Sequence, residues 1–305
     1  MRGADSTLTA VPVCVVTDST AYLPDGLAQR RGIRLVPLHV LVDGGNRLDG
    51  VQFGPPELVA ALGRRATITT SRPTPGEFEA VYTEALRAGA DAVLSVQLSR
   101  GLSGTWEAAR LAAEQVGAQR VRVVDSRTTG MGLGFAVLAA AAVASAGGDL
   151  DAVCDTAQRV AARTRTYFCV DTLEHLRRGG RIGPATALLG TALAVKPLLH
   201  VDAGRLVPLE KVRTAARARA RLVELAVAAA GQAPVDVAVH HLGAADRAAE
   251  LAEQLQARLP VLSGCLISEV GAVIGAHTGP GMLGVVVLPG GLGAPATDEE
   301  SGRSN

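Results

Sequence analysis

Short β-branched runs alternate with helical stretches in the first half of the chain, and this alternation constrains the fold more than any other feature. Each run precedes a loop and then a helix-type segment, which predicts parallel strands with helices on both faces of a sheet. The predicted strands are residues 13–16, 33–36, 92–96 and 120–124, and the predicted helices are residues 77–88, 105–115 and 132–146. We therefore expect an α/β fold whose N-terminal part is a doubly wound parallel sheet.

The second half of the chain has a different pattern. Residues 197–200 and 205–208 flank an Asp/Gly turn, which predicts an antiparallel hairpin. Other strands are expected at 167–170, 235–240, near Leu266 and at 285–288, and helices at 149–163, 213–230 and 244–259. A chain of 305 residues is long enough for two cores. We expect an N-terminal α/β domain over 11–163 and a C-terminal α/β domain with a mixed sheet over 164–289, between disordered segments at 1–10 and 290–305.

The composition excludes several classes of protein. Thirty basic and twenty-nine acidic residues give a net charge of +1, so no strong overall field attracts nucleic acid or an anionic membrane. The four cysteines are widely spaced in apolar surroundings, which predicts buried thiols in a reducing cytoplasm and no zinc site. Residues 128–148 carry no charge but are rich in Gly and Ala, which favours a buried helix over a membrane span. We expect a cytoplasmic protein without a signal peptide, an integral membrane span, a metal or an organic cofactor.

Polar residues follow the predicted parallel strands, where the ligand crevice of such a sheet lies. Asp18 and Ser19 follow the first strand, and Ser103 and Thr105 lie in the loop after the third. Residues 69–76 form another loop rich in hydroxyl groups. We expect these loops to converge on one rim.

Three of the polar segments could bind an anion. Ser103 lies between glycines just before a predicted helix, where free N–H groups and the helix dipole favour a carboxylate or a phosphate. His277 lies in the glycine-rich segment 275–281, and its imidazole could donate a hydrogen bond. The third segment is the loop 69–76. Each of the three segments also has a purely structural interpretation: Ser103 or Thr105 could cap the helix, residues 69–76 could form a capping loop, and His277 could be an ordinary surface or core histidine.

Seven short motifs, taken in order, resemble the DegV family of bacterial fatty-acid-binding proteins. They are VTDST at residues 16–20, TSRPTPGEF at 70–78, LSGTW at 102–106, VDSR at 124–127, LRRGGRI at 176–182, VKPLL at 195–199 and HTGPG at 277–281. Together they cover roughly residues 11–289. Their joint occurrence at compatible spacing is far more specific than any single motif.

The resemblance implies a two-domain α/β protein that buries one long-chain fatty acid in an apolar tunnel. It also implies that the protein presents the carboxylate to a separate fatty-acid kinase of the dihydroxyacetone-kinase-like type and does not itself catalyse the transfer. By the same resemblance, Thr70 or Ser71, Ser103 and His277 would bind the carboxylate. Other residues near the head group would be Asp18, Ser19, Arg72, Arg100, Gly104, Thr105, Thr278 and Gly279.

Three residues depart from the usual pattern of that family. Arg72 stands where the family usually has Gln, Arg100 where it usually has Ser, and Trp106 where it usually has Tyr or Phe. The two arginines add positive charge near the rim. There they could pair with an acyl phosphate, pair with acidic residues of a partner, or alter the choice of ligand.

Two questions stay open from the sequence. The basic loop with Arg177, Arg178 and Arg181 is either a docking surface for an acidic kinase or a solvated loop. The protein is either a carrier, as the resemblance implies, or a hydrolase or acyltransferase with Ser103 as nucleophile and His277 as base. A sensor of another anionic lipid is a third possibility.

Overall fold

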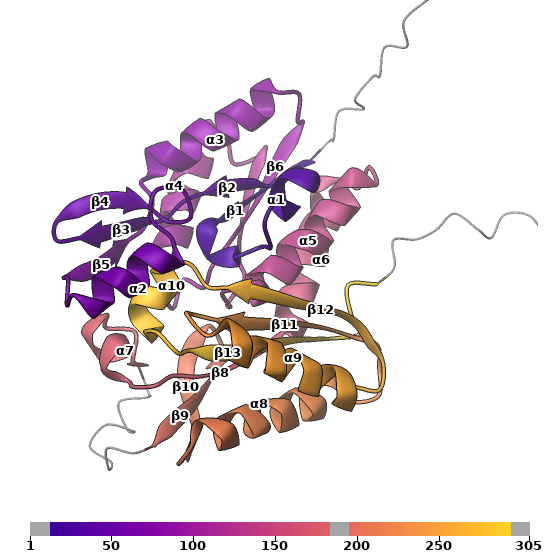
Figure 1. Ribbon diagram of the computed structural model, residues 1–305. Helices are drawn as coiled ribbons and strands as arrows, with labels where there is room; N and C mark the ends of the chain where they lie inside the picture. The colour runs from indigo at the N-terminus through magenta and orange to yellow at the C-terminus, as the bar shows by residue number, and fades with distance from the viewer. Residues whose placement is uncertain (1–12, 184–194, 294–305) are drawn as a thin grey trace, which may run out of the picture.

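The computed structural model describes residues 13–183 and 195–293 and shows two large sheets with helical layers around them (Figure 1). The segment expected to be disordered at 1–10 lies outside the described residues, as does the part of the expected C-terminal segment from 294 onward. All strands of the first large sheet precede the predicted domain boundary at 163/164, and all strands of the second follow it. The division of the chain into two domains at this point stays a prediction.

The first sheet has four parallel strands in the order β2 (Arg34–Val36), β1 (Val13–Asp18), β6 (Ala92–Gln97) and β7 (Val121–Asp125). These are the four strands that the β-branched runs predict. Val13 lies opposite Ala92 in the register of β1 with β6. The carboxyl ends of all four strands therefore lie at the same edge of the sheet.

Helices cover both faces of this sheet. One face carries α3 (Pro75–Arg87) and α4 (Thr105–Val116), and the other carries α5 (Met131–Ser145) and α6 (Leu150–Arg163). Side chains of β1 alternate between the two layers, as a strand buried on both faces requires: Val16 packs in the core of α3 and α4, and Val15 in that of α5 and α6. The predicted doubly wound arrangement is confirmed.

The second sheet has six strands and is mixed, as predicted. Its order is β10 (Arg205–Val212), β9 (Lys196–Asp202), β8 (Arg165–Cys169), β13 (Leu283–Pro289), β11 (Val235–His241) and β12 (Leu262–Glu269). Among the strands of this sheet in the described part of the chain, only β11 and β12 pair in parallel. The hairpin of β9 and β10 turns at Ala203 and Gly204, which both have positive φ, in the Asp/Gly turn expected from the sequence.

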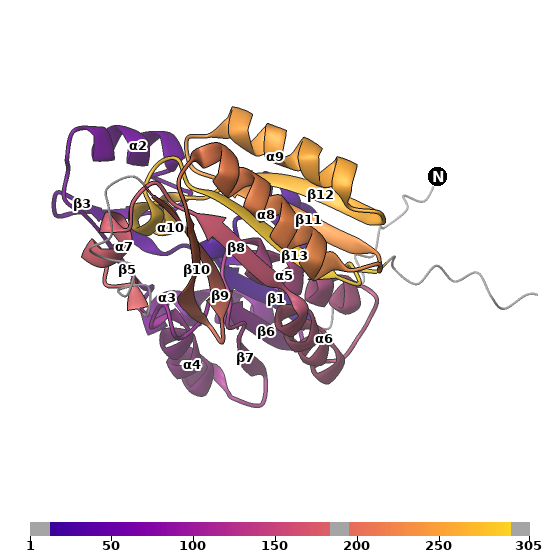
Figure 2. The same cartoon turned by 90° about the horizontal axis from the view of Figure 1, so that it is seen from below.

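Figure 2 shows α8 (Ala215–Ala230) and α9 (Ala245–Arg258) on the outer face of the second sheet and α5 on the side toward the first sheet. Twelve of the fifteen residues of α5 are buried, and its core includes Ala238 and Val286 of the second sheet. Small side chains allow a helix to pack between two sheets in this way. The buried-helix interpretation of residues 128–148 is therefore correct, and no helix within 13–183 or 195–293 is long and apolar enough to cross a bilayer.

A third, antiparallel sheet was not expected from the sequence. It consists of β4 (Gly45–Leu48), β3 (His39–Val42) and β5 (Ile68–Ser71). The prediction of a loop over 69–76 is wrong at its start, because Thr70 and Ser71 lie on β5. Thr74 is the N-cap residue of α3, and Pro75 is the first residue of this helix. The interpretation of this segment as a helix cap is therefore correct for Thr74.

Three short helices pack in the core beneath the third sheet, namely α2 (Pro55–Gly63), α7 (Glu174–Arg178) and α10 (Ala272–Thr278). Two others, η1 (Ser19–Ala21) and α1 (Leu27–Arg30), follow β1 and pack in the core of α5. The core beneath it combines the two halves of the chain, since Val40 and Leu58 share it with Phe168 and Val273. The candidate site lies at this junction.

Candidate functional site

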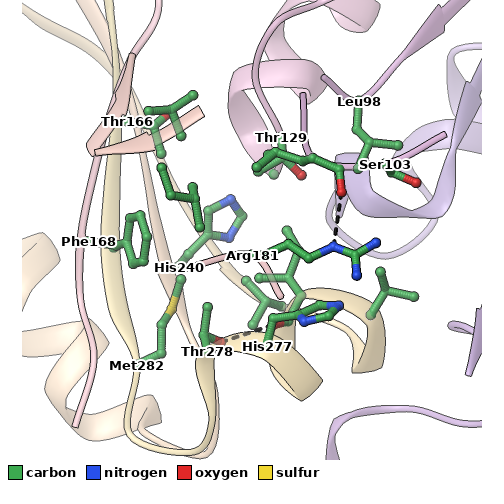
Figure 3. A pocket seen from close by; sticks show the side chains of 18 of the residues that line it. Leu98, Ser103, Thr129, Thr166, Phe168, Arg181, His240, His277, Thr278 and Met282 are labelled. Carbon is green, nitrogen blue, oxygen red and sulfur yellow. Dashed lines mark hydrogen bonds between the residues drawn. The ribbon is translucent and has the colours of Figure 1, made fainter. Parts of the chain in front are cut away.

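A cavity opens between the third sheet, the loop that precedes α4, and the second sheet. It contains about 890 Å³ free of protein atoms, part of it open to solvent, within the range of small-molecule sites. Figure 3 shows Ser103, Arg181 and His277 on one side of the cavity and Phe168 and Met282 on the opposite side. Apolar side chains dominate the lining, among them Leu38, Leu98, Phe168, Leu176, Val273, Met282 and Val285.

His277 and Thr70 meet across 207 positions of sequence. Thr70 comes from β5 and His277 from the last turn of α10, and Thr70 Oγ1 lies 2.8 Å from His277 Nε2. Both residues line the cavity. The structure thus brings together two of the residues that the family resemblance assigns to the carboxylate.

Burial holds the His277 imidazole neutral. Loss of solvent, together with the smaller effect of the positive charge of Arg181, lowers the pKa of His277 to about 4. His277 Nδ1 is buried and has no hydrogen-bond partner among the described residues. A buried lone pair costs less than a buried N–H without an acceptor, so we assign the proton to Nε2, which donates to Thr70 Oγ1. The Thr70 hydroxyl hydrogen is then free to point to a ligand.

A backbone contact fixes the His277 ring on its other side. A Cβ atom built on Gly179 would lie 1.9 Å from His277 Nδ1, so only glycine lets the chain pass so close to the ring. Gly179 follows α7 directly. Gly179, the first glycine of the motif LRRGGRI, is therefore needed for the close packing of the backbone against the His277 ring.

Asp49 fixes the start of α10. One carboxylate oxygen accepts from the N–H of Ala272 at 2.8 Å, and the other accepts from the hydroxyl groups of Ser19 at 2.8 Å and Tyr22 at 3.1 Å. The Tyr22 hydroxyl in turn accepts from the N–H of Ile274 at 3.2 Å. Burial raises the pKa of Asp49. Through these bonds, residues of the N-terminal half position the helix that carries His277.

Ser103 lies where the polypeptide enters α4. Its Oγ accepts from the N–H of Thr105 at 3.3 Å and lies 2.8 Å from Thr105 Oγ1. The capping alternative is therefore partly correct, although Gly104 is the N-cap residue and provides no side-chain cap. Ser103 also lines the cavity, so its hydroxyl can turn to a ligand.

Arg181 lines the cavity and is half-buried. Its Nε donates to the carbonyl oxygen of Leu102 at 3.1 Å, the bond drawn as a dashed line from Arg181 in Figure 3. Its Nη1 donates to the carbonyl oxygen of Gly179 at 2.7 Å. These neutral acceptors orient the guanidinium without cancelling its charge. The sequence placed Arg181 only on a possible docking surface, because the LRRGGRI pattern does not show which arginine turns inward.

Arg177 and Arg178 differ from Arg181 in position. Both are exposed on α7, and both pair with Glu174, at 2.7 and 2.9 Å. Their hydrogen bonds lower the pKa of Glu174 to about 2. One carboxylate for two arginines leaves this surface with a net positive charge.

The remaining residues expected near the head group divide into two sets. Ser71, Arg72 and Thr278 line the cavity, whereas Arg100 and Gly104 line a neighbouring hollow. Asp18, Ser19, Thr105 and Gly279 do not line the cavity. Asp18 is fully buried, where it accepts from the N–H groups of Thr20 at 2.9 Å and Leu98 at 2.7 Å. Asp18 therefore accepts backbone hydrogen bonds that stabilise the fold and does not face the ligand.

Two further groups bear on what the cavity can hold. His240 Nε2 accepts from the N–H of Met131 at 2.8 Å and its Nδ1 lies 3.0 Å from the carbonyl oxygen of Ser268, so this neutral histidine is already satisfied. Burial lowers its pKa to about 4. Within the described part of the chain, no three His, Cys, Asp or Glu side chains form a group that could hold a metal ion.

A sequence model described as "Uncharacterised protein, DegV family" matches residues 12–290. The chain belongs to the DegV family. A DegV domain-containing protein of Streptomyces coelicolor is 54% identical over 275 residues, which cover 90% of this chain and 98% of the relative. The family resemblance expected from the seven motifs is thereby confirmed.

Solved structures of DegV proteins share the fold. A DegV family protein from Thermus thermophilus, described as binding fatty acid, superposes with a TM-score of 0.87 at 38% identity, covering 91% of this chain and 99% of its own. DegV of Bacillus subtilis, described as a fatty acid binding protein, gives a TM-score of 0.83 at 35% identity, with 91% and 99% covered.

Proposed function

We propose that this DegV family protein binds one long-chain fatty acid in the cavity and presents its carboxylate to a separate fatty-acid kinase. The observation that carries the proposal is the arrangement of the cavity in Figure 3, with Ser103, Arg181 and His277 together at one end and the apolar side chains of Phe168 and Met282 away from them. An amphipathic ligand with one anionic end matches this arrangement. The fatty-acid-binding relatives have the same fold.

The apolar lining provides the free energy for the tail. A chain with ~15 buried CH₂ groups at ~0.8 kcal/mol each gains about 12 kcal/mol before the costs of association and ordering. Hydroxyl groups of Thr129 and Thr166 interrupt the apolar wall, and their Oγ1 atoms have no partner among the described residues. The lining is otherwise that of a lipid site.

The head group meets donors of three kinds. The Thr70 hydroxyl is oriented by His277, the Ser103 hydroxyl lies at the start of α4, and Arg181 supplies a positive charge. Hydrogen bonds between such donors and a carboxylate are charge-assisted and stronger than neutral ones. In this proposal Ser71 lies beside Thr70 at the mouth, where it is exposed.

The kinase would approach at the mouth of the cavity. Arg177 and Arg178 lie on the exposed face of α7, in the same loop region as Arg181, and form a positive surface suited to an acidic partner. The protein would then act in the cytoplasm as a carrier without a metal or an organic cofactor.

The geometry disfavours the alternative of a hydrolase. Ser103 Oγ is hydrogen-bonded to Thr105, and His277 Nε2 is hydrogen-bonded to Thr70, so no bond joins the expected nucleophile to the expected base. A serine nucleophile needs its base within hydrogen-bond reach. We therefore place both residues in binding.

Fatty-acid binding and ester turnover by the S103A variant separate the two functions. We expect wild-type protein, freed of lipid, to bind hexadecanoate at one site per chain, and Ser103→Ala to weaken the affinity about ten-fold. Neither protein should turn over an activated ester faster than Arg258→Gln, a control on the exposed face of α9. Turnover that disappears only in Ser103→Ala would contradict the carrier.

A further inference from the structure

Three threonine hydroxyl groups lie at or beside the otherwise apolar part of the cavity wall. Thr129, in the loop before α5, and Thr166, on β8, line the cavity. Thr128 is buried next to Thr129 in the chain. The Oγ1 atoms of all three are buried and have no hydrogen-bond partner in the part of the chain that the structure describes. A buried hydroxyl without a partner costs about 1–3 kcal/mol, so this threonine cluster is suited to a polar atom of a ligand.

The threonine cluster lies away from the head-group residues. Thr166 and Phe168 alternate on β8 and therefore face the same side of the sheet. Their partners in the register of β13, Val286 and Gly284, also line the cavity. Figure 3 shows Thr166 and Phe168 on the side of the cavity away from Ser103. A fatty acid with its carboxylate at Ser103 therefore brings the distal half of its tail to the cluster.

Gly132, in the first turn of α5, lets two of these hydroxyl groups approach each other. A Cβ atom built on Gly132 would collide with Thr128 Oγ1 and would lie 3.2 Å from Thr166 Oγ1. The space that a larger residue would fill is thus bordered by hydroxyl oxygens from both halves of the chain. Glycine at this position keeps the two oxygens close together and free of a covering side chain.

The loop that carries Thr128 and Thr129 is held by its backbone rather than by these hydroxyl groups. The carbonyl oxygen of Thr128 accepts from the N–H of Ser99 at 2.9 Å. His240 Nε2 accepts from the N–H of Met131 at 2.8 Å, which joins the start of α5 to the second sheet. The threonine hydroxyls are therefore available to a ligand without the loss of a bond that holds the fold.

A neutral hydroxyl group on the ligand fits the cluster better than a charged group does. A hydroxyl both donates and accepts, as the threonine side chains do, so each can satisfy the other. The arginines that line the cavity in the described part of the chain, Arg72 and Arg181, both donate to carbonyl oxygens of the loop before α4, at the head-group end. A charge placed at the threonine cluster would therefore be buried without a partner of opposite sign.

We propose that the cavity takes a long-chain fatty acid with a hydroxyl group on the distal half of its chain, and that Thr129 and Thr166 bind this hydroxyl. This inference rests on the proposed function and names a narrower class of ligand for the same cavity. An unsubstituted fatty acid still binds through its carboxylate and its tail, but it leaves the threonine hydroxyls without a partner. The cluster thus favours the hydroxylated chain.

Calorimetric titration of lipid-free protein with octadecanoate and its monohydroxy derivatives tests this preference. We expect wild-type protein to bind at least one isomer with the hydroxyl on carbon 10, 12 or 14 as tightly as octadecanoate or more tightly. A hydroxyl buried in a wholly apolar cavity would instead weaken binding about ten-fold or more. The 2-hydroxy isomer, with its hydroxyl beside the carboxylate, is the positional control.

Thr129→Val and Thr166→Val remove the hydroxyl groups and keep the branched shape of the side chain. We expect each to weaken binding of the preferred hydroxy acid about ten-fold and to change octadecanoate binding less than about two-fold. Thr67→Val, at an exposed position outside the cavity lining, is the matched control and should change neither. Thermal unfolding of the lipid-free variants should show no loss of stability, because the hydroxyls have no partner among the described residues.

Octadecanoate binding separates this inference from the proposed function. Wild-type protein that binds octadecanoate but binds every distal hydroxy acid ten-fold more weakly would overturn the inference and leave the proposed function intact. Equal losses for both ligands in the two cavity variants, or a loss that extends to the 2-hydroxy isomer, would also overturn it. Failure to bind any of these acids would overturn both.

Discussion

The neutral, buried His277 predicts how the stability of the protein changes with pH. Burial lowers the pKa of His277 from 6.5 to about 4 in the folded protein. In the unfolded chain the imidazole binds a proton as the pH falls through 6.5, whereas in the folded protein it does so only near pH 4. The free energy of unfolding must therefore decrease as the pH falls between these values. A difference of about 2.5 pH units corresponds to about 3 kcal/mol for this one residue.

His277→Gln isolates this contribution. Urea unfolding of lipid-free wild type and variant over this pH range gives two curves, and contributions shared by both proteins, including that of the buried His240, cancel in their difference. We expect the stability difference, wild type minus variant, to fall by about 3 kcal/mol between pH 6.5 and pH 4. Thr70→Ser, which keeps both the histidine and a hydroxyl, should follow the wild-type curve. A difference that stays constant with pH would refute the assignment of a buried, neutral His277.

Three other substitutions test how the head-group site is held. Thr70→Val removes the hydroxyl that joins His277 to the ligand and should weaken hexadecanoate binding about ten-fold in a titration, while Thr70→Ser should retain the affinity. Gly179→Ala forces a methyl group into the His277 ring, so we expect a loss of about 1–3 kcal/mol in thermal unfolding together with weaker hexadecanoate binding; an unchanged affinity would contradict the contact. Asp49→Ala leaves the hydroxyls of Ser19 and Tyr22 and the first N–H of α10 without their acceptor, and urea unfolding should show a loss of at least about 3 kcal/mol, with Asp49→Asn losing less.

Much of the architecture could be predicted because buried strands in parallel sheets have a strong sequence pattern. The Val-rich runs that form β1 and β6 are apolar on both faces, and the helix that lies between the two sheets is recognisable from its uncharged Ala and Gly residues. The third sheet was missed although its hairpin carries a recognisable signal. Asp43 and Gly44, both with positive φ, form the two-residue turn between β3 and β4, and Asp-Gly is a favoured pair there.

The site was predictable only in part, because its geometry depends on contacts between distant segments. Motif resemblance pointed to Thr70, Ser103 and His277, and all three line the cavity. No local pattern shows that Arg181 turns inward while its neighbours on α7 face solvent. Nor does the sequence show that the Thr166 hydroxyl lies beside that of Thr128 at the start of α5, since that contact depends on the fold of both halves of the chain.

The most direct test of the account is the lipid content of the protein itself. The protein would be purified without added lipid, weighed intact under native conditions, and extracted with organic solvent for mass spectrometry. We predict an intact mass greater than that of the chain by one long-chain fatty acid, with the same fatty acid released into the extract. A protein that is empty, and that also fails to take up added fatty acids, would contradict the account.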